Sequence, residues 1–430
     1  MNYNQTLEYL YQKLPMYQRI GAAAYKKDLD NTLALSAFLN NPHTKFKSVH
    51  VAGTNGKGSV THGIAAILQA AGYKTGVYVS PHYRDFRERI KINGQYIPKK
   101  AVINFVKKCQ PVLEDINPSF FEATVCMAFD YFARMAIDVA VVEVGLGGRL
   151  DSTNIIHPEL AVITNISLDH TDMLGDTLPL IAAEKAGIIK AQTPVVIGET
   201  NPQTAPVFIQ KAANMAAPIF FADQILEIKN FEQNLLGCKA NIENSGQLIY
   251  PDLSTDLTGD FQRHNLLSIL QSVETLKQQG FIIPKEAIYA GLNQVKPLTN
   301  FIGRWHVLQQ HPLAIADSGH NEAGIKFVAT QLQALNAQKL HLVIGFSKDK
   351  SIDAILQLLP TKNTVYYFCK ANIPKGLSQD ELQATAARFG LHGQTYPSVK
   401  AAYKAALKAA NPLHDAVFVG GSIFVVGEVI

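Results

Sequence analysis

The chain has 430 residues, of which 47% are hydrophobic and 17% charged, so it is long enough to bury the cores of two domains. Its formal net charge of +4 is small and dispersed, which argues against a nucleic-acid surface or a polybasic membrane anchor and favours small anions as partners. The 4 cysteines form no C-x-x-C pair, which argues against a zinc site or disulfide framework and for a reducing cytosol.

The N-terminal segment is polar and aromatic and lacks the apolar core of a signal peptide. No later run approaches the roughly 20 apolar residues of a spanning helix. We therefore expect a cytoplasmic protein that binds neither membrane nor nucleic acid, with a monomer as the default.

From residue 47 onward, short β-branched runs alternate with longer helical patterns. The predicted strands of this part are 48–52, 75–80, 138–145 and 160–166, and the predicted helices are 60–71, 122–136 and 177–191. Gly72 ends the first of these helices. The alternation is typical of a parallel sheet covered by helices on both faces.

The pattern changes around residues 225–260 to short polar strand-like pieces, which predict a small antiparallel patch at the edge of the first domain. A helical pair follows over 262–294, and residues 293–304 carry the Pro, Asn and Gly of a linker. We place the boundary near residue 299, between domains 1–298 and 299–430. The predicted strands of the second domain are 313–319, 340–346, 364–370 and 415–421.

Residues 49–68, VHVAGTNGKGSVTHGIAAIL, indicate a phosphate-binding loop between a strand and a helix, in a variant form. A standard loop has glycine where Val51 stands, and here Gly58 separates Lys57 from Ser59. The glycines allow backbone N–H groups to approach phosphate oxygens at a helix N-terminus, and Lys57 is expected to reach the β and γ phosphates. The alternative is a glycine-rich turn with an exposed lysine.

Hard ligands for a divalent cation stand at the ends of predicted strands. Ser80, Glu143 and His170 each follow a strand at the edge where parallel sheets gather ligands. Magnesium suits a hydroxyl and a carboxylate, whereas an imidazole is less usual. Singly, Glu143 could be a paired buried acid and His170 a capping or core histidine, but their joint position favours a metal site. The predicted fold class is α/β, with a P-loop-containing parallel-sheet ATPase domain and a second, smaller Rossmann-like domain.

Seven segments together resemble the folylpolyglutamate synthase and dihydrofolate synthase family, which belongs to the Mur ligase superfamily of ATP-dependent amide-forming enzymes. The segments are HVAGTNGKGSV, SPHYRDFRERIKING, FFEAT, EVGLGGRLDSTNII, DHTDMLGDTLPLIAAEKAGIIK, GRW and DSGHN. They occur in order from about residue 15 to the C-terminal GGSIFVVGEV. The resemblance thus implies an ATP-binding central domain followed by a glutamate-ligase domain.

The resemblance also implies residue roles in ATP binding. The ATP phosphates would be held by Gly53, Thr54, Asn55, Gly56, Lys57, Gly58 and Ser59. Magnesium would be bound by Ser80, Glu143 and His170. The adenine and ribose would be bound by Asn265, Arg304 and Asp317, with His320 near the terminal phosphates.

Lys185, in AEKAGIIK, matches the lysine that the family carbamylates. A carbamate would turn a cation into an anion near the metal, while the unmodified amine would be a positive charge beside the phosphates. The sequence leaves the state of Lys185 open.

The implied reaction begins when a substrate carboxylate attacks the γ phosphate of ATP, with Lys57 and magnesium offsetting the charge. The amine of L-glutamate then attacks the acyl phosphate, and ADP and phosphate leave. Closure of the smaller domain would exclude water from the intermediate. No residue identifies itself as the base for the ammonium proton.

The acceptor and glutamate sites are also implied by the resemblance. Ser119, Phe121 and Asp151 match positions that dihydrofolate synthases use for pteroate, although a phenylalanine that opens an apolar helix is often a core residue. Lys350 and Ser422 resemble glutamate-binding positions, although a surface lysine is usually only solvated. The expected substrates are L-glutamate with dihydropteroate, reduced folates or both.

Three other functions compete with this interpretation. A cell-wall Mur ligase would carry a UDP-sugar-binding domain ahead of the loop, for which the roughly fifty preceding residues are few. A nucleotide-binding regulatory protein would not need Lys185, a cleft between two domains and the DSGHN segment together, and a kinase would release a stable phosphorylated product. A folylpolyglutamate synthase without dihydrofolate synthase activity also remains open, as do the glutamate chain length and any monovalent-ion requirement.

Overall fold

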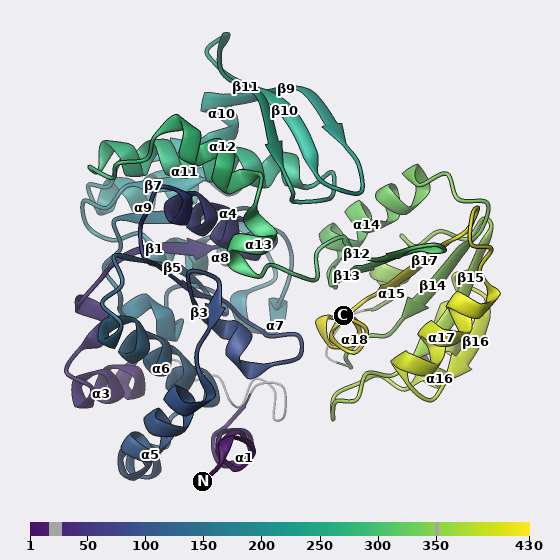
Figure 1. Ribbon diagram of the computed structural model, residues 1–430, viewed down its shortest axis with the longest axis horizontal. Coiled ribbons are helices and arrows are strands. Elements are labelled where there is room, and N and C mark those ends of the chain that lie inside the picture. The colour runs from purple at the N-terminus through teal and green to yellow at the C-terminus, as the bar shows by residue number, and fades with distance from the viewer. Residues whose placement is uncertain (17–27, 349–351) are drawn as a thin grey trace. The chain divides into compact units, whose positions relative to one another are not determined.

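The computed structural model describes residues 1–16, 28–348 and 352–430, and the chain folds into two compact units (Figure 1). The large unit consists of Met1–Glu232, Gly237–Leu257 and Gln262–Phe301, and the small unit consists of Gln233–Leu236, Thr258–Phe261 and Ile302–Ile430. Each unit has its own mostly parallel sheet with helices around it, so the predicted α/β fold class is confirmed.

Within the described residues, the large unit contains an eight-stranded sheet with the order β4-β3-β2-β5-β1-β6-β7-β8. Its strands are β1 (Lys47–Ala52), β2 (Thr75–Tyr78), β3 (Ile90–Ile92), β4 (Gln95–Tyr96), β5 (Val139–Glu143), β6 (Leu160–Ile163), β7 (Val195–Ile197) and β8 (Ile219–Phe221). The strands from β2 to β8 in this order are parallel, and β3 and β4 extend the sheet as an antiparallel hairpin. The hairpin was not predicted from the sequence.

Helices cover the large sheet, and a smaller second sheet packs against some of these helices. The helices are α1 (Tyr3–Lys13), α3 (Asp30–Phe38), α4 (Lys57–Ala70), α5 (Lys99–Ile116), α6 (Phe120–Arg134), α7 (Thr171–Leu174), α8 (Leu178–Lys185), α9 (Ala205–Asn214), α10 (Ala222–Ile225), α11 (Gln262–Gln278), α12 (Lys285–Leu292) and α13 (Val295–Thr299). The strands β9 (Leu226–Gln233), β10 (Cys238–Asn244) and β11 (Gln247–Thr255) form a separate three-stranded sheet where the antiparallel patch was predicted.

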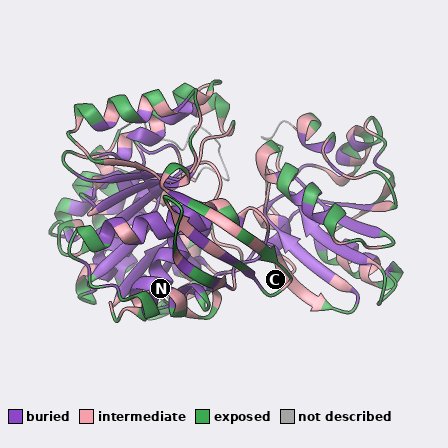
Figure 2. Cartoon of the chain, turned by 90° about the horizontal axis from the view of Figure 1, so that it is seen from above, coloured by how far each residue is buried: buried purple, intermediate pink, exposed green. Residues whose placement is uncertain are grey.

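The central strands are buried on both faces because alternate side chains enter different cores. In β5, Val139 and Val141 pack with α4 and α11, whereas Ala140 and Val142 pack with α5 and α6. Figure 2 shows these strands as buried and the outer faces of the covering helices as exposed. This explains why the strands have continuous apolar sequences without a polar alternation.

Three helical segments also differ from the sequence-based expectation. The predicted helix 177–191 ends at Lys185, where a 3-10 turn over Ala186–Ile188 follows. The helix after the phosphate loop begins at Lys57 rather than Val60, because Gly56 adopts a left-handed conformation with φ 84° and ends the loop there. The expected linker 293–304 contains the short helix α13. Pro297 is its third residue, where the helix requires no N–H donor, so the proline is compatible with it.

The small unit contains, within its described residues, a six-stranded sheet with the order β12-β13-β17-β14-β15-β16. Its strands are β12 (His306–Gln310), β13 (Leu313–Asp317), β14 (Leu340–Ile344), β15 (Thr364–Cys369), β16 (Gly393–Tyr396) and β17 (Ala416–Gly420), and its helices are α14 (Glu322–Ala334), α15 (Ile352–Leu356), α16 (Gln379–Ala387), α17 (Val399–Ala409) and α18 (Ile423–Gly427). Only β12 is antiparallel to its neighbour in this sheet. The edge strands β12 and β16 were not predicted.

Two short segments that are distant in sequence also belong to the small unit. Leu235 packs against the core that contains Trp305, and the hydroxyl of Thr258 donates to the Trp305 carbonyl at 2.9 Å. The rings of Phe261 and Phe327 lie 6.3 Å apart. The small unit is therefore built from three separate stretches of the chain. Across the described residues, no helix is both long and apolar enough to cross a membrane.

Candidate active site

The predicted phosphate loop, Gly53–Ser59, connects β1 to α4 at the carboxyl edge of the large sheet. Gly53 has φ 144° and Gly56 has φ 84°, which side chains rarely adopt. A Cβ atom on Gly53 would lie 1.9 Å from the Thr164 hydroxyl, and one on Gly56 would lie 2.2 Å from the Asn265 side-chain oxygen. Both glycines are therefore required by conformation and by space.

The segment after β6 holds the phosphate loop from one side. The N–H of Thr54 donates to the Asn165 carbonyl and the N–H of Asn55 to the Asn165 side-chain oxygen, both at 2.9 Å. The Thr54 hydroxyl donates to the Ser167 carbonyl at 3.1 Å and accepts from the Ser167 N–H at 3.0 Å. Neither Asn165 nor Ser167 was predicted as a site residue. Asn165 lies within the predicted strand 160–166, but β6 ends at Ile163, so both residues belong to the segment after the strand.

Helix α11 holds the phosphate loop from another side. The amide of Gln262 donates to the Ser59 hydroxyl at 3.3 Å, and the amide of Asn265 donates to the Gln262 side-chain oxygen at 2.8 Å. Asn265, expected from the resemblance to bind adenine or ribose, thus lies at the start of a helix that contacts the loop directly.

Two lysines donate to the same carbonyl oxygen of the loop. Lys57 donates to the carbonyls of Gly53 and Thr54 at 3.0 Å, and Lys185 donates to that of Gly53 at 2.9 Å. Lys185 is only 5% exposed. Burial, and then the nearby charge of Lys57, lower the pKa of Lys185 to about 7. The structure thus brings together the two lysines predicted to act in catalysis.

The three predicted magnesium ligands stand at the carboxyl ends of β2, β5 and β6, of which β5 and β6 flank β1. Glu143 ends β5 and pairs in register with Val51 of β1, while Ser80 follows β2, the neighbour of β5 on its other side. His170 precedes α7 in the connection after β6, which neighbours β1. All three therefore lie at the edge that carries the phosphate loop.

The chemistry of this donor set fits magnesium. No group of three or more His, Cys, Asp or Glu arranged for a metal occurs in the described ranges. Magnesium in nucleotide sites takes few protein ligands and completes its shell with water and phosphate oxygens. One hydroxyl, one carboxylate and one imidazole beside a phosphate loop are sufficient for such an ion.

The buried carboxylate of Asp151 is surrounded by donors of its own chain. It accepts hydrogen bonds from the N–H groups of Leu146 at 2.8 Å and Thr153 at 3.0 Å, and from the Thr153 hydroxyl. Burial raises the pKa of Asp151, and these bonds oppose the rise. The Thr153 hydroxyl also contacts Nε2 of the buried His50 at 2.8 Å. Asp151 therefore holds the loop after β5 in addition to any ligand role.

The other two predicted pteroate residues stand at the start of α6. The Ser119 hydroxyl accepts from the N–H of Glu122 at 3.2 Å, which makes it the N-cap of the helix. Phe121 is half-buried, and its ring lies 6.2 Å from that of Tyr78. A Cβ on Gly145 would lie 2.3 Å from this ring, so Phe121 covers the loop after β5. The structure thus brings Phe121 to the loop that Asp151 holds.

In the small unit, Asp317 ends β13 and organises the residues around it. Its carboxylate accepts from the N–H groups of Trp305 at 2.8 Å and Gly319 at 2.7 Å. Burial raises the pKa of Asp317, although the Arg304 guanidinium opposes the rise. Arg304 donates to the Ser318 hydroxyl, and Nδ1 of His320 lies 3.0 Å from the Ser318 carbonyl. The predicted residues Arg304, Asp317 and His320 therefore form one local cluster.

Of the two residues predicted to bind glutamate, only one lies within the described residues. The Ser422 hydroxyl accepts from the N–H of Phe424 at 3.1 Å and caps the short helix α18. Ser422 follows β17, whose last residue pairs in register with Asp317. Lys350 lies outside the described residues.

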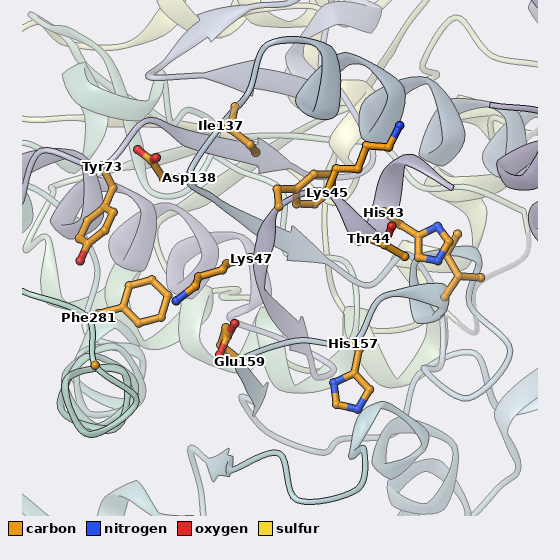
Figure 3. A pocket seen from close by; sticks show the side chains of 13 residues that line it. His43, Thr44, Lys45, Lys47, Tyr73, Ile137, Asp138, His157, Glu159 and Phe281 are labelled. Carbon is orange, nitrogen blue, oxygen red and sulfur yellow. The ribbon is translucent and has the colours of Figure 1, made fainter. Parts of the chain in front are cut away.

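A separate hollow of about 790 Å³ lies at the opposite, amino edge of the large sheet (Figure 3). Its lining includes Lys47, which begins β1, and Asp138 and Glu159, which precede β5 and β6. Figure 3 shows the Lys47 amine beside Phe281, at 4.9 Å from the ring centre. No residue of the predicted site lines this hollow, which we call the amino-edge hollow.

Two family models match the chain. The model described as "Mur ligase middle domain" matches residues 51–273, and the one described as "Mur ligase, glutamate ligase domain" matches residues 303–423. The first begins in β1 directly before the phosphate loop, and the second contains the Arg304, Asp317 and His320 cluster.

Curated relatives match over nearly the whole chain. A "Dihydrofolate synthase/folylpolyglutamate synthase" of Bacillus subtilis is 32% identical over 413 residues, which cover 94% of both chains. A "Probable bifunctional folylpolyglutamate synthase/dihydropteroate synthase" of Haloferax volcanii is 32% identical over 437 residues. The chain spans 50% of the length of that relative.

Solved structures are similar over the same extent. Folylpolyglutamate synthase of Mycobacterium tuberculosis, complexed with ADP, is 30% identical and superposes with a TM-score of 0.88 over 99% of this chain and 97% of that one. Escherichia coli FolC in complex with DHPP and ADP is 27% identical, with a TM-score of 0.86 over 100% and 97%.

Proposed function

The chain belongs to the folylpolyglutamate synthase and dihydrofolate synthase family of Mur-type ATP-dependent ligases, and we propose that it couples L-glutamate to both folates and dihydropteroate. The observation that supports ATP use most directly is the phosphate loop Gly53–Ser59, where two lysines converge on the Gly53 carbonyl. Domain 1–298 would bind ATP, and domain 299–430 would complete the ligase. We propose that the enzyme works as a monomer in the cytoplasm.

In the proposed reaction, the acceptor carboxylate attacks the γ phosphorus of ATP and ADP leaves, which gives an acyl phosphate. The glutamate amine then attacks the acyl carbon, and the C–O bond to phosphate breaks as the amide forms. Backbone N–H groups of the loop at the start of α4 would bind phosphate oxygens, with Lys57 offsetting their charge. The Lys57 amine lies against the backbone of this loop, where it donates to the carbonyls of Gly53 and Thr54.

We propose Ser80, Glu143 and His170 as the residues that hold magnesium, because they share one sheet edge with the loop. The ion, when bound, would neutralise charge on the β and γ phosphates. A separate test is equilibrium binding of manganese, followed by its paramagnetic signal, to the wild type and to Glu143→Gln. Similar affinities in the two proteins would argue against this ligand set.

Lys185 is proposed to carry a carbamate. With a pKa of about 7, a large share of its amine is neutral near neutral pH, and the neutral amine is the form that attacks CO₂. The nitrogen forms a bond to carbon, one C–O π bond becomes a carboxylate, and the nitrogen releases a proton. The Lys57 ammonium nearby would offset the new negative charge. Carbon-13 NMR of the protein in labelled bicarbonate should show a carbamate signal that is absent in Lys185→Met.

In the small unit, we propose Arg304 and Asp317 for adenine and ribose, together with Asn265 of the large unit, and His320 for the terminal phosphates. The cluster around Asp317 supports this role, because its hydrogen bonds fix the segment between Trp305 and Gly319. Ser422 and Lys350 remain the proposed glutamate residues.

The acceptor proposal concerns Ser119, Phe121 and Asp151. Phe121 offers a half-buried ring for a planar pterin, and Asp151 offers a carboxylate of fixed orientation. The test is ADP release with ATP, magnesium and L-glutamate, with dihydropteroate or tetrahydrofolate as acceptor and with the products identified by mass. Both acceptors should gain glutamate. If only tetrahydrofolate does, the pteroate assignment is wrong, and if neither does, the ligase proposal fails.

A further inference from the structure

A buried lysine outside the proposed site links two segments that are far apart in sequence. Lys91 lies in the middle of β3 and is 3% exposed. Its amine is 2.9 Å from the Thr299 carbonyl, 3.0 Å from the Asn300 carbonyl and 3.1 Å from Nε2 of His62. An ammonium group has three N–H donors, and these three acceptors use all of them.

His62 continues this chain of hydrogen bonds to the phosphate loop. It lies on α4, and its Nδ1 is 2.7 Å from the Gly58 carbonyl. A carbonyl only accepts hydrogen bonds, so Nδ1 carries the proton and the lone pair of Nε2 faces Lys91. Burial lowers the pKa of His62 well below its usual range, in agreement with a neutral ring. Lys91 is thus connected through one histidine to a glycine of the loop.

The other end of the network is the segment Thr299–Phe301, by which the chain leaves the large unit, here called the exit segment. The Phe301 ring lies 4.7 Å from that of His62, and a Cβ on Gly58 would lie 3.7 Å from it. The N–H of Phe301 donates to the Lys296 carbonyl at 3.3 Å. The exit segment therefore contacts the helix of the phosphate loop both by packing and through Lys91.

The β3–β4 hairpin fixes the exit segment from its other side. The side-chain amide of Asn300 donates to the Gly94 carbonyl at 2.8 Å, and a Cβ on Gly94 would lie 2.3 Å from the Leu298 carbonyl. Lys91 belongs to the same hairpin. The hairpin thus carries both the ammonium that binds the exit segment and the turn that packs against it.

A buried ammonium at position 91 costs desolvation free energy, so the presence of a lysine there needs an explanation. Burial lowers the pKa of Lys91 to about 8, although Glu88 and Glu143 oppose this effect. The two carbonyls that it binds stand at the end of α13, where a helix leaves its last carbonyls without partners. An uncharged side chain would remove the donor from the buried Thr299 carbonyl, which costs more than the loss of an exposed contact.

We propose that Lys91 is a positioning residue, which couples nucleotide binding at the phosphate loop to the conformation of the exit segment. This inference rests on the proposed ligase function. Nucleotide that orders the N-terminus of α4 would order His62 and Lys91, and thereby the carbonyls of Thr299 and Asn300. The alternative is that Lys91 only holds the hairpin in place.

Hydrogen exchange of the full chain, with and without ADP, distinguishes these alternatives. In the wild type, ADP should slow exchange at both the phosphate loop and the exit segment. In Lys91→Met, ADP should still protect the loop, but the protection of the exit segment should be lost. Lys285→Met is the matched control, because Lys285 also donates to a carbonyl, that of Ile249 at 2.7 Å, and should behave as the wild type.

Two results would overturn the proposal. In the first, ADP still protects the exit segment from exchange in Lys91→Met. In the second, ADP protects the phosphate loop of the wild type but not its exit segment. If ADP fails to protect even the loop, the proposed ATP site fails instead, so the two failures are distinguishable.

His62→Phe provides a second variant in case Lys91→Met does not fold. It keeps a ring against Phe301 but removes both hydrogen bonds, and it should reduce exit-segment protection by ADP without abolishing loop protection. For Lys91→Met itself, kcat for ligation should fall about tenfold, while the Kd for ADP should change less than about threefold. Equal losses in both quantities would indicate a purely structural role.

Discussion

The two edges of the large sheet differ in how they treat charge. At the carboxyl edge, Lys57 and Lys185 share the Gly53 carbonyl, and Lys185 is almost fully buried. At the amino edge, Lys45 and Lys47 line the amino-edge hollow but are exposed. The desolvation of a buried charge must be offset by nearby polar groups, whereas an exposed lysine carries no such desolvation cost. The size of a hollow is therefore a poorer guide to function than the burial of ionisable groups around it.

The largest effect is expected at the carboxyl edge from Lys57→Met. The change removes the cation proposed to offset the phosphate charge, and removal of one such group typically costs about 10²–10³-fold in kcat. The fold should survive, because the Gly53 carbonyl keeps its bond from Lys185. Steady-state ADP release measures the loss, and a thermal melt serves as the control. A loss smaller than about tenfold would contradict the proposed role.

Lys185→Met is expected to lower activity and to alter the pH dependence of stability. The pKa of Lys185 is about 7 in the folded chain against a usual 10.5, so the unfolded chain binds the additional proton between these values. The wild type, in CO₂-free buffer, should therefore gain stability relative to Lys185→Met as the pH rises from about 7 toward 10.5. Melting temperatures across this range test the sign. Parallel curves would mean that the buried amine has an ordinary pKa.

A smaller effect is expected from Asn165→Ala, which loosens the phosphate loop without removing a charge. The change removes the bond to the Asn55 N–H, which is worth about 1 kcal/mol, together with the bond from the Asn165 amide to Glu199, so the KM for ATP should rise about fivefold. Asn214→Ala is the matched control, because the Asn214 side chain accepts one exposed hydrogen bond from Gln210. Equal KM values for the two variants would show that the hydrogen bond from the Asn55 N–H to Asn165 has no role in ATP binding.

The smallest effect is expected at the amino edge. Lys47→Met removes an exposed cation beside Phe281 and should change kcat/KM for ligation by less than about twofold. A larger change, measured in the same assay, would contradict the expected difference between the two edges and would indicate a functional site at the amino-edge hollow.

The central features of the fold were predictable because their signals are local. Glycine spacing in the phosphate loop, β-branched runs and polar residues after strands all lie within short windows. These signals identified the phosphate loop and led to the α/β fold class. They also selected Ser80, Glu143 and His170, which stand at the carboxyl ends of β2, β5 and β6 on one edge of the sheet. The roles of these residues stay predictions.

The parts that were missed depend on distant contacts. The strands β3 and β4 are too short to show a period, and their pairing with β2 and with each other is what defines them. Asn165 and Lys91 are ordinary residues in the sequence, and only the fold brings them to Asn55 and Thr299. Helix α13 was missed because the proline and glycine of this segment indicated a linker. Proline is nevertheless tolerated in the first turn of a helix, where Pro297 stands.

The division of the small unit into three stretches limits how the protein can be dissected. A fragment that begins at Ile302 would lack Leu235, Thr258 and Phe261, which contribute to its core and its hydrogen bonds. A fragment that ends at Phe301 would carry these side chains into solvent without their partners. Separate expression of the two halves is therefore expected to give insoluble or poorly folded products, and studies of the halves would require their co-expression.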